Sequence, residues 1–526
     1  MNKLSVLDVT LRDGGCVNNF NFGQEYMEKI LAAQEKSGVE IIELGYIDEK
    51  NGSEEGRTQY INDQVITKCI LKEKKPGIKY VAMMDYGKFN PENLQPRSEK
   101  TIDGLRVAFH KKNCKDIVAV GKTIMAKGYE FFIQPMITLR YSDAEMIELI
   151  EMVNRELPDA SGFYIVDSFG EMRPNDMGRM LNLVDHNLIP SMPLGFHSHN
   201  NLQMSYSNAV EMLQFPTNRD LMLDCSIMGM GKGAGNLNTE LLLEHLNLFY
   251  GKQYNTAPLL EVIDKVINQL HSENYWGYAV EYYLSSINGC TPSYAGHFYN
   301  KHMLPVDQVA ELLGMIDENK KISFDKEYAE ELYRQYNERK SIDDADTVKD
   351  LRSQFEGKKV LLIAPGKSIL GARDEIQKLV DDSEICTISL NNFEFATDYI
   401  LTTRVEAYDR AVKDGANIIV TSNISKGGRG TVKILDYRNW IVVDESTHDS
   451  SGVIALNLLK ECGAKEVLLA GFDGFSVNIN ENYCNPSLRH PVTEEQAQIR
   501  NRFFKGFVDE VRGKMPVTFI TETVYE

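Results

Sequence analysis

The sequence predicts an α/β protein with two parallel-sheet domains: an N-terminal (β/α)8 TIM barrel with a helical extension, and a C-terminal Rossmann-like α/β domain. Up to about residue 250, short apolar runs typical of β-strands alternate with amphipathic helical segments, which gives eight strand–helix units. From Lys359 onward strands alternate with helices a second time. A chain of 526 residues suits two or three domains.

The expected elements follow one another at regular spacing. In "EYMEKILAAQEKSG", Met27, Ile30, Leu31 and Gln34 mark one face of a helix. An open doubly wound sheet is the alternative for the first half, but eight evenly spaced units favour closure into a barrel. The expected barrel strands are 5–9, 40–45, 79–85, 104–109, 130–136, 162–167, 193–197 and 221–226, and the later strands are 359–364, 384–390, 398–403, 417–422, 440–444, 466–471 and 516–521.

Composition predicts four segments. Residues 1–254 form the barrel, and residues 255–339 form a helical, aromatic and then charged extension. Residues 340–357 read as a linker with a surface helix, and residues 358–526 form the Rossmann-like domain.

Charge and cysteine content exclude several classes of protein. Lys and Arg number 57 against 76 Asp and Glu, a net charge of −19, which disfavours nucleic acid and anionic membranes as partners. The first residues lack the apolar core of a signal peptide, and no apolar run reaches about 18 residues. Eight scattered cysteines without a CxxC pair indicate reduced thiols. We therefore expect a cytoplasmic protein, and a homo-oligomer.

Polar residues gather at the ends of the expected barrel strands. In such a barrel the carboxyl ends of the strands converge on one site. The residues expected there are Arg12 and Asp13 after the first strand, Glu43 on the second, Arg106 on the fourth, Asp167 and Ser168 after the sixth, and His197 and His199 at the seventh.

The segment "GFHSHNN" indicates a metal site. His197 and His199 are two residues apart, so in an extended strand both imidazoles point to the same face. With the Asp13 carboxylate they form a mixed nitrogen and oxygen set suited to Mn²⁺, Mg²⁺ or Zn²⁺. Such an ion can polarise a carbonyl group. A pair of solvated loop histidines is the alternative, and the position opposite Asp13 favours the metal.

The segment "GMGKGAGN" follows the eighth strand. Its glycines allow the backbone to approach a ligand closely. A phosphate-binding loop with Lys232 is one interpretation, because barrels often hold phosphate at this place. Asn236 offers an oxygen either to a metal ion or to the ordering of the loop.

Residues 3 to about 300 resemble the DRE-TIM metallolyases, the 3-hydroxy-3-methylglutaryl-CoA lyase-like superfamily. TLRDGG, ELG, VDSFG, HSHNN and GAGN occur in family order, and the Asp, Arg and Glu of the family name are matched by Asp13, Arg12 and Glu43. The resemblance implies that Arg12 stabilises an enolate oxygen when a C–C bond breaks. It also implies metal ligation by Asp13, His197, His199 and Asn236.

Within that superfamily the sequence is most similar to 4-hydroxy-2-oxovalerate aldolases. The segment "GLRVAFH" resembles the RVATH-type strand of those enzymes. Those enzymes read R-D-G-x-H, with the histidine as base, whereas Cys16 stands there in this chain. Cys16 is thus a candidate catalytic group, with packing as the alternative. Tyr282, Tyr283, His297 and water are further candidates for proton transfer. The expected substrate contacts are Arg106, Asp167, Ser168 and Tyr283.

The C-terminal domain carries weaker signals. "LLIAPGKSI" is not a P-loop, because Leu361 stands where that motif needs glycine. A strand followed by such a turn can still present N–H groups to an anion. IAPGKSI, SLNNFEF and SSGVIALNLLKECGAKEVLLAGFD resemble bacterial sialyltransferases that use CMP-sialic acid, which implies a cytidine nucleotide as ligand. A non-catalytic interaction domain is the alternative. The expected nucleotide contacts are Gly366, Ser368, Asn391, Ser451 and Gly452.

These observations predict a metal-dependent aldolase acting on a 2-oxo acid and an aldehyde through pyruvate enolate chemistry. Mn²⁺ is the favoured ion, with Mg²⁺, Co²⁺ and Zn²⁺ as alternatives. The fused C-terminal domain suggests an aldehyde from cell-surface sugar biosynthesis. The alternatives are a Claisen-type enzyme that condenses an acyl-CoA, and a nucleotide-sugar or glycosyl-transfer protein that uses the C-terminal domain.

Overall fold

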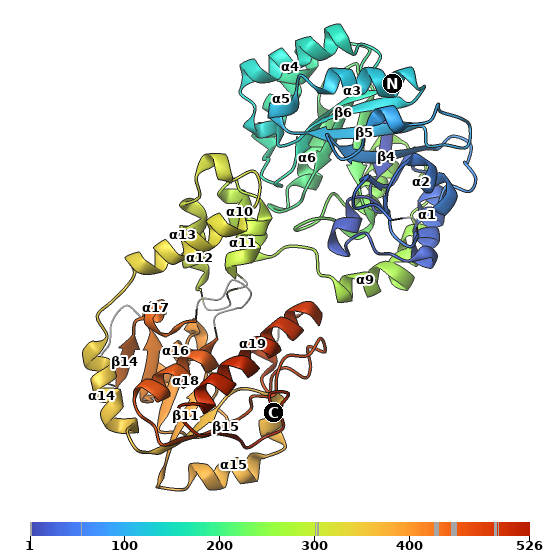
Figure 1. Cartoon of the computed structure of the whole chain (residues 1–526). Helices are drawn as coiled ribbons and strands as arrows, with labels where there is room; N and C mark the ends of the chain where they lie inside the picture. Colours follow the sequence, from blue (N-terminus) through green and yellow to red (C-terminus); the bar gives the residue numbers. More distant parts are fainter. Residues whose placement is uncertain are drawn as a thin grey trace. The chain divides into compact units, whose positions relative to one another are not determined.

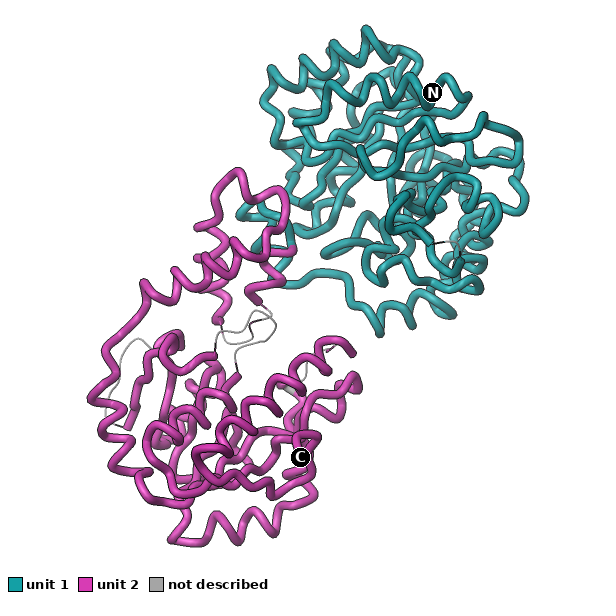
Figure 2. The backbone as a smooth tube through the Cα atoms, in the orientation of Figure 1, with its two compact units in different colours: residues 1–292 teal, residues 293–526 magenta. Residues whose placement is uncertain are grey.

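The computed structural model describes residues 3–53, 55–299, 301, 304–424, 431–442, 450–488, 492 and 494–526. The chain divides into two compact units, residues 1–292 and 293–526 (Figure 2). The division falls inside the expected helical extension 255–339, so each unit takes a part of it. No helix of the described residues is both long and apolar enough to cross a membrane.

The first unit is a closed barrel of parallel strands with helices around it (Figure 1), as the sequence predicted. The strand order β1-β9-β8-β7-β6-β5-β4-β2 closes through pairing of β1 with β2, and the short β3 adds to β2 outside the ring. The strands are β1 (Leu4–Asp8), β2 (Ile41–Ile47), β3 (Gln59–Tyr60), β4 (Lys79–Asp85), β5 (Gly104–Phe109), β6 (Glu130–Pro135), β7 (Gly162–Asp167), β8 (Leu194–Ser198) and β9 (Leu221–Cys225).

The helices of this unit pack on the outside of the barrel. In α1, Met27, Ile30, Leu31 and Gln34 are buried on one face, which confirms the predicted amphipathic helix. The helices are α1 (Gln24–Ser37), α2 (Asp63–Cys69), α3 (Ile117–Ala126), α4 (Asp143–Glu156), α5 (Pro174–Asn187), α6 (Ser205–Gln214), α7 (Thr239–Tyr250), α8 (Ala257–Val262), α9 (Asn268–Glu273) and α10 (Val280–Ile287).

The interior of the barrel changes from apolar to polar along the strands. One buried apolar cluster inside the barrel consists of Leu7, Val9, Ile41, Val81, Phe132, Tyr164, Val166 and Met222. Alternate residues of a strand share a face, so the inward face of β4 continues from Val81 through Met83 to Asp85. The inward face of β5 carries Arg106, which lies opposite Met83 in the register. The apolar floor therefore supports a polar upper layer at the carboxyl ends of the strands.

The second unit contains a parallel seven-stranded sheet of order β14-β13-β12-β11-β10-β15-β16. The chain runs outward from β10 to β14 and returns to β15 beside β10, so the strand order reverses between β10 and β15. Leu361 and Ile363 pack with Ile376 of α15, while Val360 and Leu362 alternate to the other face and are also fully buried. Both faces of the sheet are therefore covered, as in doubly wound folds.

The strand predicted at 440–444 is wrong for its described part. Trp440 ends a short helix and its indole N–H donates to the Asp344 carboxylate at 2.8 Å, while residues 441–442 are not in a strand. Residues 443 and 444 lie outside the described residues. The edge strand is Val432–Leu435 instead. The apolar run was misread because Trp440 is buried by a tertiary contact rather than by strand pairing.

The remaining elements belong to the second unit. The strands are β10 (Lys359–Ile363), β11 (Ile385–Leu390), β12 (Tyr399–Thr402), β13 (Ile418–Thr421), β14 (Val432–Leu435), β15 (Glu466–Ala470) and β16 (Val517–Phe519). The helices are α11 (Pro292–Tyr299), α12 (Val306–Gly314), α13 (Lys326–Arg339), α14 (Ala345–Phe355), α15 (Arg373–Val380), α16 (Val405–Lys413), α17 (Tyr437–Trp440), α18 (Ser451–Glu461) and α19 (Glu494–Arg512).

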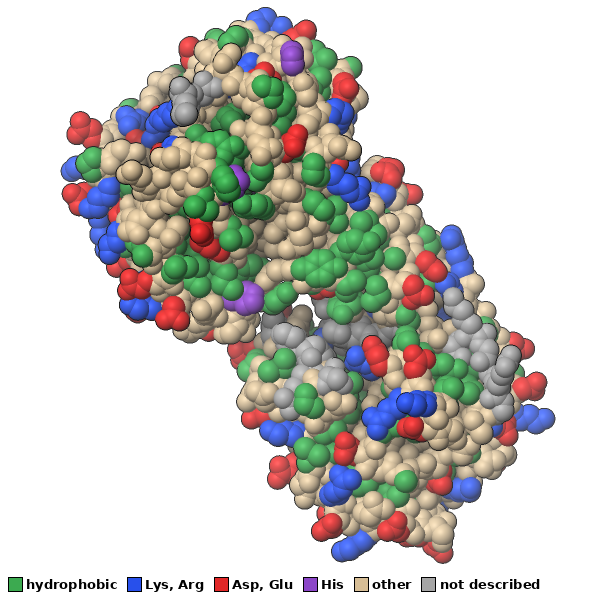
Figure 3. Space-filling view, turned by 180° about the vertical axis from the view of Figure 1, so that it is seen from behind, with side chains coloured by type: hydrophobic (Ala, Val, Ile, Leu, Met, Phe, Trp, Pro, Cys, Tyr) green, Lys and Arg blue, Asp and Glu red, His purple; other side chains and the backbone are tan. Residues whose placement is uncertain are grey.

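The surface carries charges of both signs. On the face that Figure 3 shows, acidic and basic side chains are interspersed, and the described residues there form no broad basic area. This distribution accords with the net charge of −19.

Gly195 on β8 provides a test of the packing beneath the polar layer. A Cβ at this position would lie 2.4 Å from the ring of Tyr164. Gly195→Ala should therefore lower the free energy of unfolding by about 1–3 kcal/mol, measured by denaturant titration. Gly178→Ala on α5 is the matched control, since its Cβ would come no closer than 3.7 Å to the Glu211 carboxylate. The control should be neutral or stabilising by about 0.5–1 kcal/mol. Equal unfolding free energies for the two variants would contradict this account.

Candidate active site

Arg12 and Asp13 sit in a tight turn that follows β1. The backbone N–H groups of both residues donate to the carbonyl of Val9, at 3.0 and 2.8 Å. Gly15 is required by packing, because a Cβ there would lie 2.4 Å from the Phe20 ring. A Cβ at Gly14 would likewise lie 3.1 Å from the Met230 side chain. The turn thereby holds a charge pair at the open end of the barrel.

Asp13, His197 and His199 converge as the sequence predicted. One ligand atom from each lies within 4.8 Å of the other two. The Asp13 Oδ2 is 3.4 Å from His197 Nε2 and 3.9 Å from His199 Nε2. The two imidazoles meet edge to face with centroids 5.4 Å apart. These three side chains form a compact set of nitrogen and oxygen ligands.

Asn236 lies beside this set. Its backbone forms an antiparallel bridge with His199, and its amide nitrogen donates to the Met230 carbonyl at 3.1 Å. The Asn236 Oδ1 and the His199 Nδ1 are buried, and neither has a hydrogen-bond partner among the described residues. Buried acceptors without donors are costly. A bound cation would satisfy such acceptors, so these residues fit a metal ion.

The protonation states of Asp13 and His199 suit a bound cation, whereas a proton on the His197 Nε2 must leave before that atom can bind one. Burial opposes the ionisation of Asp13, yet the Arg12 guanidinium and the two histidines hold the pKa of its carboxyl well below its usual range. Burial lowers the pKa of His199 to about 4, so that its imidazole is neutral. Burial also disfavours the charged form of His197, but hydrogen bonds to Asp13 and Asp224 raise the pKa of that imidazole above its ordinary value.

Asp224 orients His197 from behind. The Asp224 Oδ2 lies 2.9 Å from His197 Nδ1. With the proton on Nδ1, the Nε2 lone pair is left toward Asp13, which is the arrangement that a carboxylate gives to a metal-binding histidine. The same carboxylate pairs with the Nη2 of Arg106.

Two buried arginines complete the network. Arg12 donates from Nε to Glu43 Oε2 and from Nη1 to Asp13 Oδ2, both at 2.6 Å. Its Nη2 is buried and has no hydrogen-bond partner among the described residues. Glu43 Oε1 also lies 3.0 Å from Arg106 Nη1. Three carboxylates, those of Asp13, Glu43 and Asp224, thus hold the two guanidinium groups.

Arg106 lies deeper than a substrate contact is expected to lie. The residue is completely buried, and its guanidinium stacks over the Tyr164 ring at 4.8 Å from the centroid. In this arrangement it supports Glu43 and Asp224. Its predicted contact with substrate stays a prediction.

The charges of this network leave an excess of negative charge. Arg12 and Arg106 bring two positive charges, whereas Asp13, Glu43 and Asp224 bring three negative ones. An uncompensated buried charge is unfavourable. A proton on His197, whose pKa is raised by its hydrogen bonds to Asp13 and Asp224, or a divalent cation beside Asp13 would remove the excess.

Asp167 and Ser168 are engaged in ordering the loop after β7. The Asp167 carboxylate accepts the N–H groups of Glu171 and Met172 at 3.0 and 3.1 Å. Burial raises the pKa of Asp167 to about 7, although these two bonds act against the shift. The Ser168 hydroxyl accepts the N–H of Ile137 at 2.9 Å. These hydrogen bonds to backbone N–H groups were not predicted from the sequence. The predicted contact of Asp167 and Ser168 with substrate stays a prediction.

The predicted tyrosines lie on α10. This helix is tied to the barrel by Ser286, whose hydroxyl donates to the carbonyl of Phe169 at 2.6 Å. Tyr283 is exposed on it and Tyr282 is half-buried. His297 belongs to the second unit, where its Nε2 lies 2.9 Å from Glu330.

Cys16 lies in the turn with Arg12 and Asp13. Its side chain is exposed to solvent, although much of the surroundings is protein. Desolvation and the Asp13 carboxylate raise the pKa of the Cys16 thiol to about 12, and Arg12 and Lys232 act against the shift. Solvent at the exposed face lessens the desolvation, but the effect of the Asp13 carboxylate remains. The pKa of the thiol therefore lies above its ordinary value. The thiol is therefore protonated at neutral pH.

Asp85 is a site residue that the sequence interpretation missed. It ends β4 on the inward face, two positions beyond Met83. Tyr46 places its hydroxyl 3.3 Å from the Asp85 backbone nitrogen and also bonds the carboxylate. Burial raises the pKa of Asp85, while Tyr46 and Arg12 act against the shift. The alternation Val81, Met83, Asp85 was the available signal, since it places an acid at the barrel mouth.

Comparisons with known proteins identify the family of the barrel. A family model described as HMGL-like matches residues 3–266. The chain is 28% identical over 246 residues to a 4-hydroxy-2-oxovalerate aldolase 2 from Comamonas testosteroni, an alignment that covers 46% of this chain and 67% of the relative. It is 26% identical over 250 residues to a 4-hydroxy-2-oxovalerate aldolase from Geobacillus genomosp. 3, covering 46% and 70%. Among solved structures, the N-terminal domain of a candidate aldolase from Bacteroides vulgatus is 25% identical with a TM-score of 0.49, covering 56% of this chain and 96% of that one.

Asp224 allows a test of the ligand set that does not touch a ligand. Asp224→Asn removes the charged acceptor behind His197, so the affinity for Mn²⁺ should fall by about 10–100-fold, measured by calorimetric titration of metal-free protein. Asp220→Asn, at an exposed acid next to β9, is the control and should bind Mn²⁺ as the wild type does. Unchanged Mn²⁺ affinity in a folded Asp224→Asn protein would show that Asp224 does not orient the ligand.

Proposed function

Because the chain belongs to the HMGL-like family, we propose that its barrel makes or breaks a carbon–carbon bond between a 2-oxo acid and an aldehyde. The Nη2 group of Arg12 is the observation that carries the proposal. It is a buried donor beside Asp13 with no partner among the described residues. An oxygen that gains negative charge during aldol cleavage or addition would be its acceptor. The names of the relatives, 4-hydroxy-2-oxovalerate aldolases, support this class of reaction.

A divalent metal ion would be held by Asp13, His197 and His199, with Asn236 as a further oxygen ligand. Mn²⁺ is the first candidate for a set of two imidazoles and oxygens, and Mg²⁺, Co²⁺ and Zn²⁺ are alternatives. When bound, such an ion supplies Lewis-acid polarisation of the carbonyl and carboxylate oxygens of a 2-oxo acid.

Arg12 would stabilise the enolate oxygen. Its guanidinium is held at Nε by Glu43 and at Nη1 by Asp13, so its orientation is set before substrate arrives. Donors fixed in this way cost no reorganisation when charge develops. Glu43 is then a positioning residue, and Arg106 holds its second oxygen.

Asp85 would transfer the proton. In the cleavage direction a base takes the proton of the hydroxyl group, the O–H electrons form the aldehyde carbonyl, and the electrons of the broken C–C bond pass to the 2-oxo acid fragment as its enolate. A carboxylate whose pKa is raised by burial is a better base near neutral pH than an ordinary aspartate. A thiol with a pKa of about 12 is protonated under the same conditions.

An assay of the purified chain tests the reaction class. With Mn²⁺, pyruvate and a panel of aldehydes, we expect aldol products by mass spectrometry, and sugar-derived aldehydes in the panel test the finer proposal of cell-surface sugar synthesis. Chelation should abolish product formation and Mn²⁺ should restore it. His199→Ala should lose activity by about 100-fold or more together with its bound metal. His245→Ala on α7, outside the barrel, is the matched control. Full activity after chelation would contradict the metal, and no product from any aldehyde would contradict the reaction.

The pH dependence distinguishes Asp85 from Cys16. Asp85→Asn should lower kcat by about 10²–10⁴-fold. A base acts only when ionised, and the pKa of Asp85 is raised, so wild-type kcat/KM should fall on the acid side at a pH above the ordinary aspartate range. Asp85→Asn should remove this limb, whereas Cys16→Ser should retain the limb and most of the rate. An inactive Cys16→Ser protein beside an active Asp85→Asn protein would reverse the assignment.

A further inference from the structure

The second unit contains a cavity of about 190 Å³ at the carboxyl edge of its sheet. The cavity lies where the strand order reverses between β10 and β15, and the loops after β10, β11, β12 and β15 contribute to its walls. Open α/β sheets bind their ligands at this kind of reversal. One water needs only about 10–15 Å³, so the cavity has room for an organic molecule.

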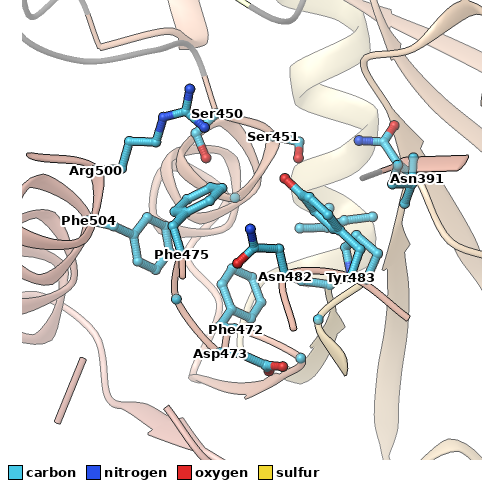
Figure 4. A pocket seen from close by; sticks show the side chains of 18 of the residues that line it. Asn391, Ser450, Ser451, Phe472, Asp473, Phe475, Asn482, Tyr483, Arg500 and Phe504 are labelled. Atoms are coloured by element: carbon cyan, nitrogen blue, oxygen red, sulfur yellow. The ribbon is translucent and has the colours of Figure 1, made fainter. Parts of the chain in front are cut away.

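One side of the cavity is aromatic. Phe472 and Phe504 stack with ring centroids 5.5 Å apart and planes 17° apart. Phe475 and Tyr483 add two further rings, which project toward the middle of the cavity in Figure 4. Flat aromatic faces favour a flat ring in the ligand, because stacking is tolerant of the exact ring.

The other side is cationic. Arg500 of α19 lines the cavity although only 7% of the residue is exposed, and its guanidinium lies 5.0 Å from the Phe475 centroid. Figure 4 shows this guanidinium beside Ser450, where α18 begins. The Ser450 side chain does not cap α18, so the first N–H groups of that helix are not bonded by it. Arg404 is a second cation of the lining, and Asp473 is the one acid among the described residues that form it.

Asp473 offsets one of these two cations and is hydrogen-bonded to the turn after β10, so the described lining keeps one net positive charge. Its carboxylate accepts the backbone N–H of Ser368 at 2.8 Å and also the Ser368 hydroxyl. The turn after β10, where the sequence predicted an anion, therefore holds a carboxylate of the chain itself. Gly366 allows this approach, since a Cβ there would lie 2.2 Å from the Gly471 carbonyl. The place left for the anion of a ligand is between Arg500 and the start of α18.

We propose that this cavity binds a nucleoside monophosphate, with the base among the aromatic rings and the phosphate between Arg500 and the first turn of α18. Inorganic phosphate would leave the aromatic wall without a contact, and an uncharged aromatic molecule would form no ion pair with the Arg500 guanidinium that lines the cavity. A helix N-terminus and a guanidinium together suit a phosphate group. This proposal does not depend on the chemistry of the barrel.

Calorimetric titration of the full-length protein tests the ligand class. The probes are AMP, GMP, CMP and UMP, the four corresponding nucleosides, ribose 5-phosphate and inorganic phosphate. At least one monophosphate should bind at least about tenfold more tightly than its nucleoside, and about tenfold more tightly than ribose 5-phosphate and inorganic phosphate. No saturable binding of any monophosphate, or equal binding by a nucleoside or by ribose 5-phosphate, would overturn the proposal.

Two variants locate the phosphate. Arg500→Gln should weaken the monophosphate about tenfold or more while leaving the nucleoside unchanged. Arg502→Gln, at an exposed arginine of the same helix, is the matched control and should bind as the wild type does. Ser451→Glu covers the case in which Arg500→Gln does not fold, because an acid in the first turn suits a helix and yet repels phosphate. Wild-type affinity for the monophosphate in folded Ser451→Glu protein would overturn the assignment.

Discussion

The buried charge network of Arg12, Glu43, Arg106 and Asp224 is the constraint on which the barrel site depends. Such a network is expensive to desolvate and adds little to stability by itself. Its effect is geometric: Glu43 holds both guanidinium groups, at Arg12 Nε and Arg106 Nη1. Arg106 in turn holds Asp224, whose other contact is the His197 imidazole. The proposed oxyanion donor Arg12 and the proposed metal ligand His197 are therefore oriented by one connected set of ion pairs, and neither can rotate without breaking it.

The barrel supplies the low-dielectric surroundings that make this network effective. The apolar cluster beneath it excludes water from the lower half of the interior. Charges next to this apolar cluster interact more strongly than they would in water, so both the attraction between opposite charges and the repulsion between like charges increase. The uneven count of charges has a consequence there, because an excess carboxylate favours a cation, either a proton on His197 or a metal ion. The same surroundings keep His199 neutral, which a metal ligand requires.

Sequence reasoning was strongest where one local period decided the outcome. The spacing of His197 and His199 fixed their common face, and the position of Asp13 after β1 brought it to them. It was weaker where a tertiary contact decided. The full burial of Arg106 depends on partners from three other strands, and Asp473 reaches back to Ser368 across 105 positions. The position of Asp85 at the barrel mouth could have been predicted, because residues of its strand alternate regularly between the two faces. The strand is otherwise apolar, which is typical of a core strand and gives no sign of the polar residue at its end.

The carboxyl edges of the two parallel sheets favour ligands of opposite charge, a cation in the barrel and an anion in the second unit. Both candidate sites lie beyond the carboxyl ends of parallel strands, where backbone N–H groups and helix starts favour anions by default. In the barrel, three carboxylates against two guanidinium groups override that default. Arg12 and Asp13 stand in the turn after β1, and the other three charged residues stand on strands. In the second unit the core residues of β10 and β15 are apolar. Asp473, the one acid among the described residues that line the cavity, is hydrogen-bonded to Ser368 in the turn after β10. The helix start and Arg500 then set the sign of the cavity. The choice between cation and anion thus follows from whether carboxylates or guanidinium groups are in excess around each site.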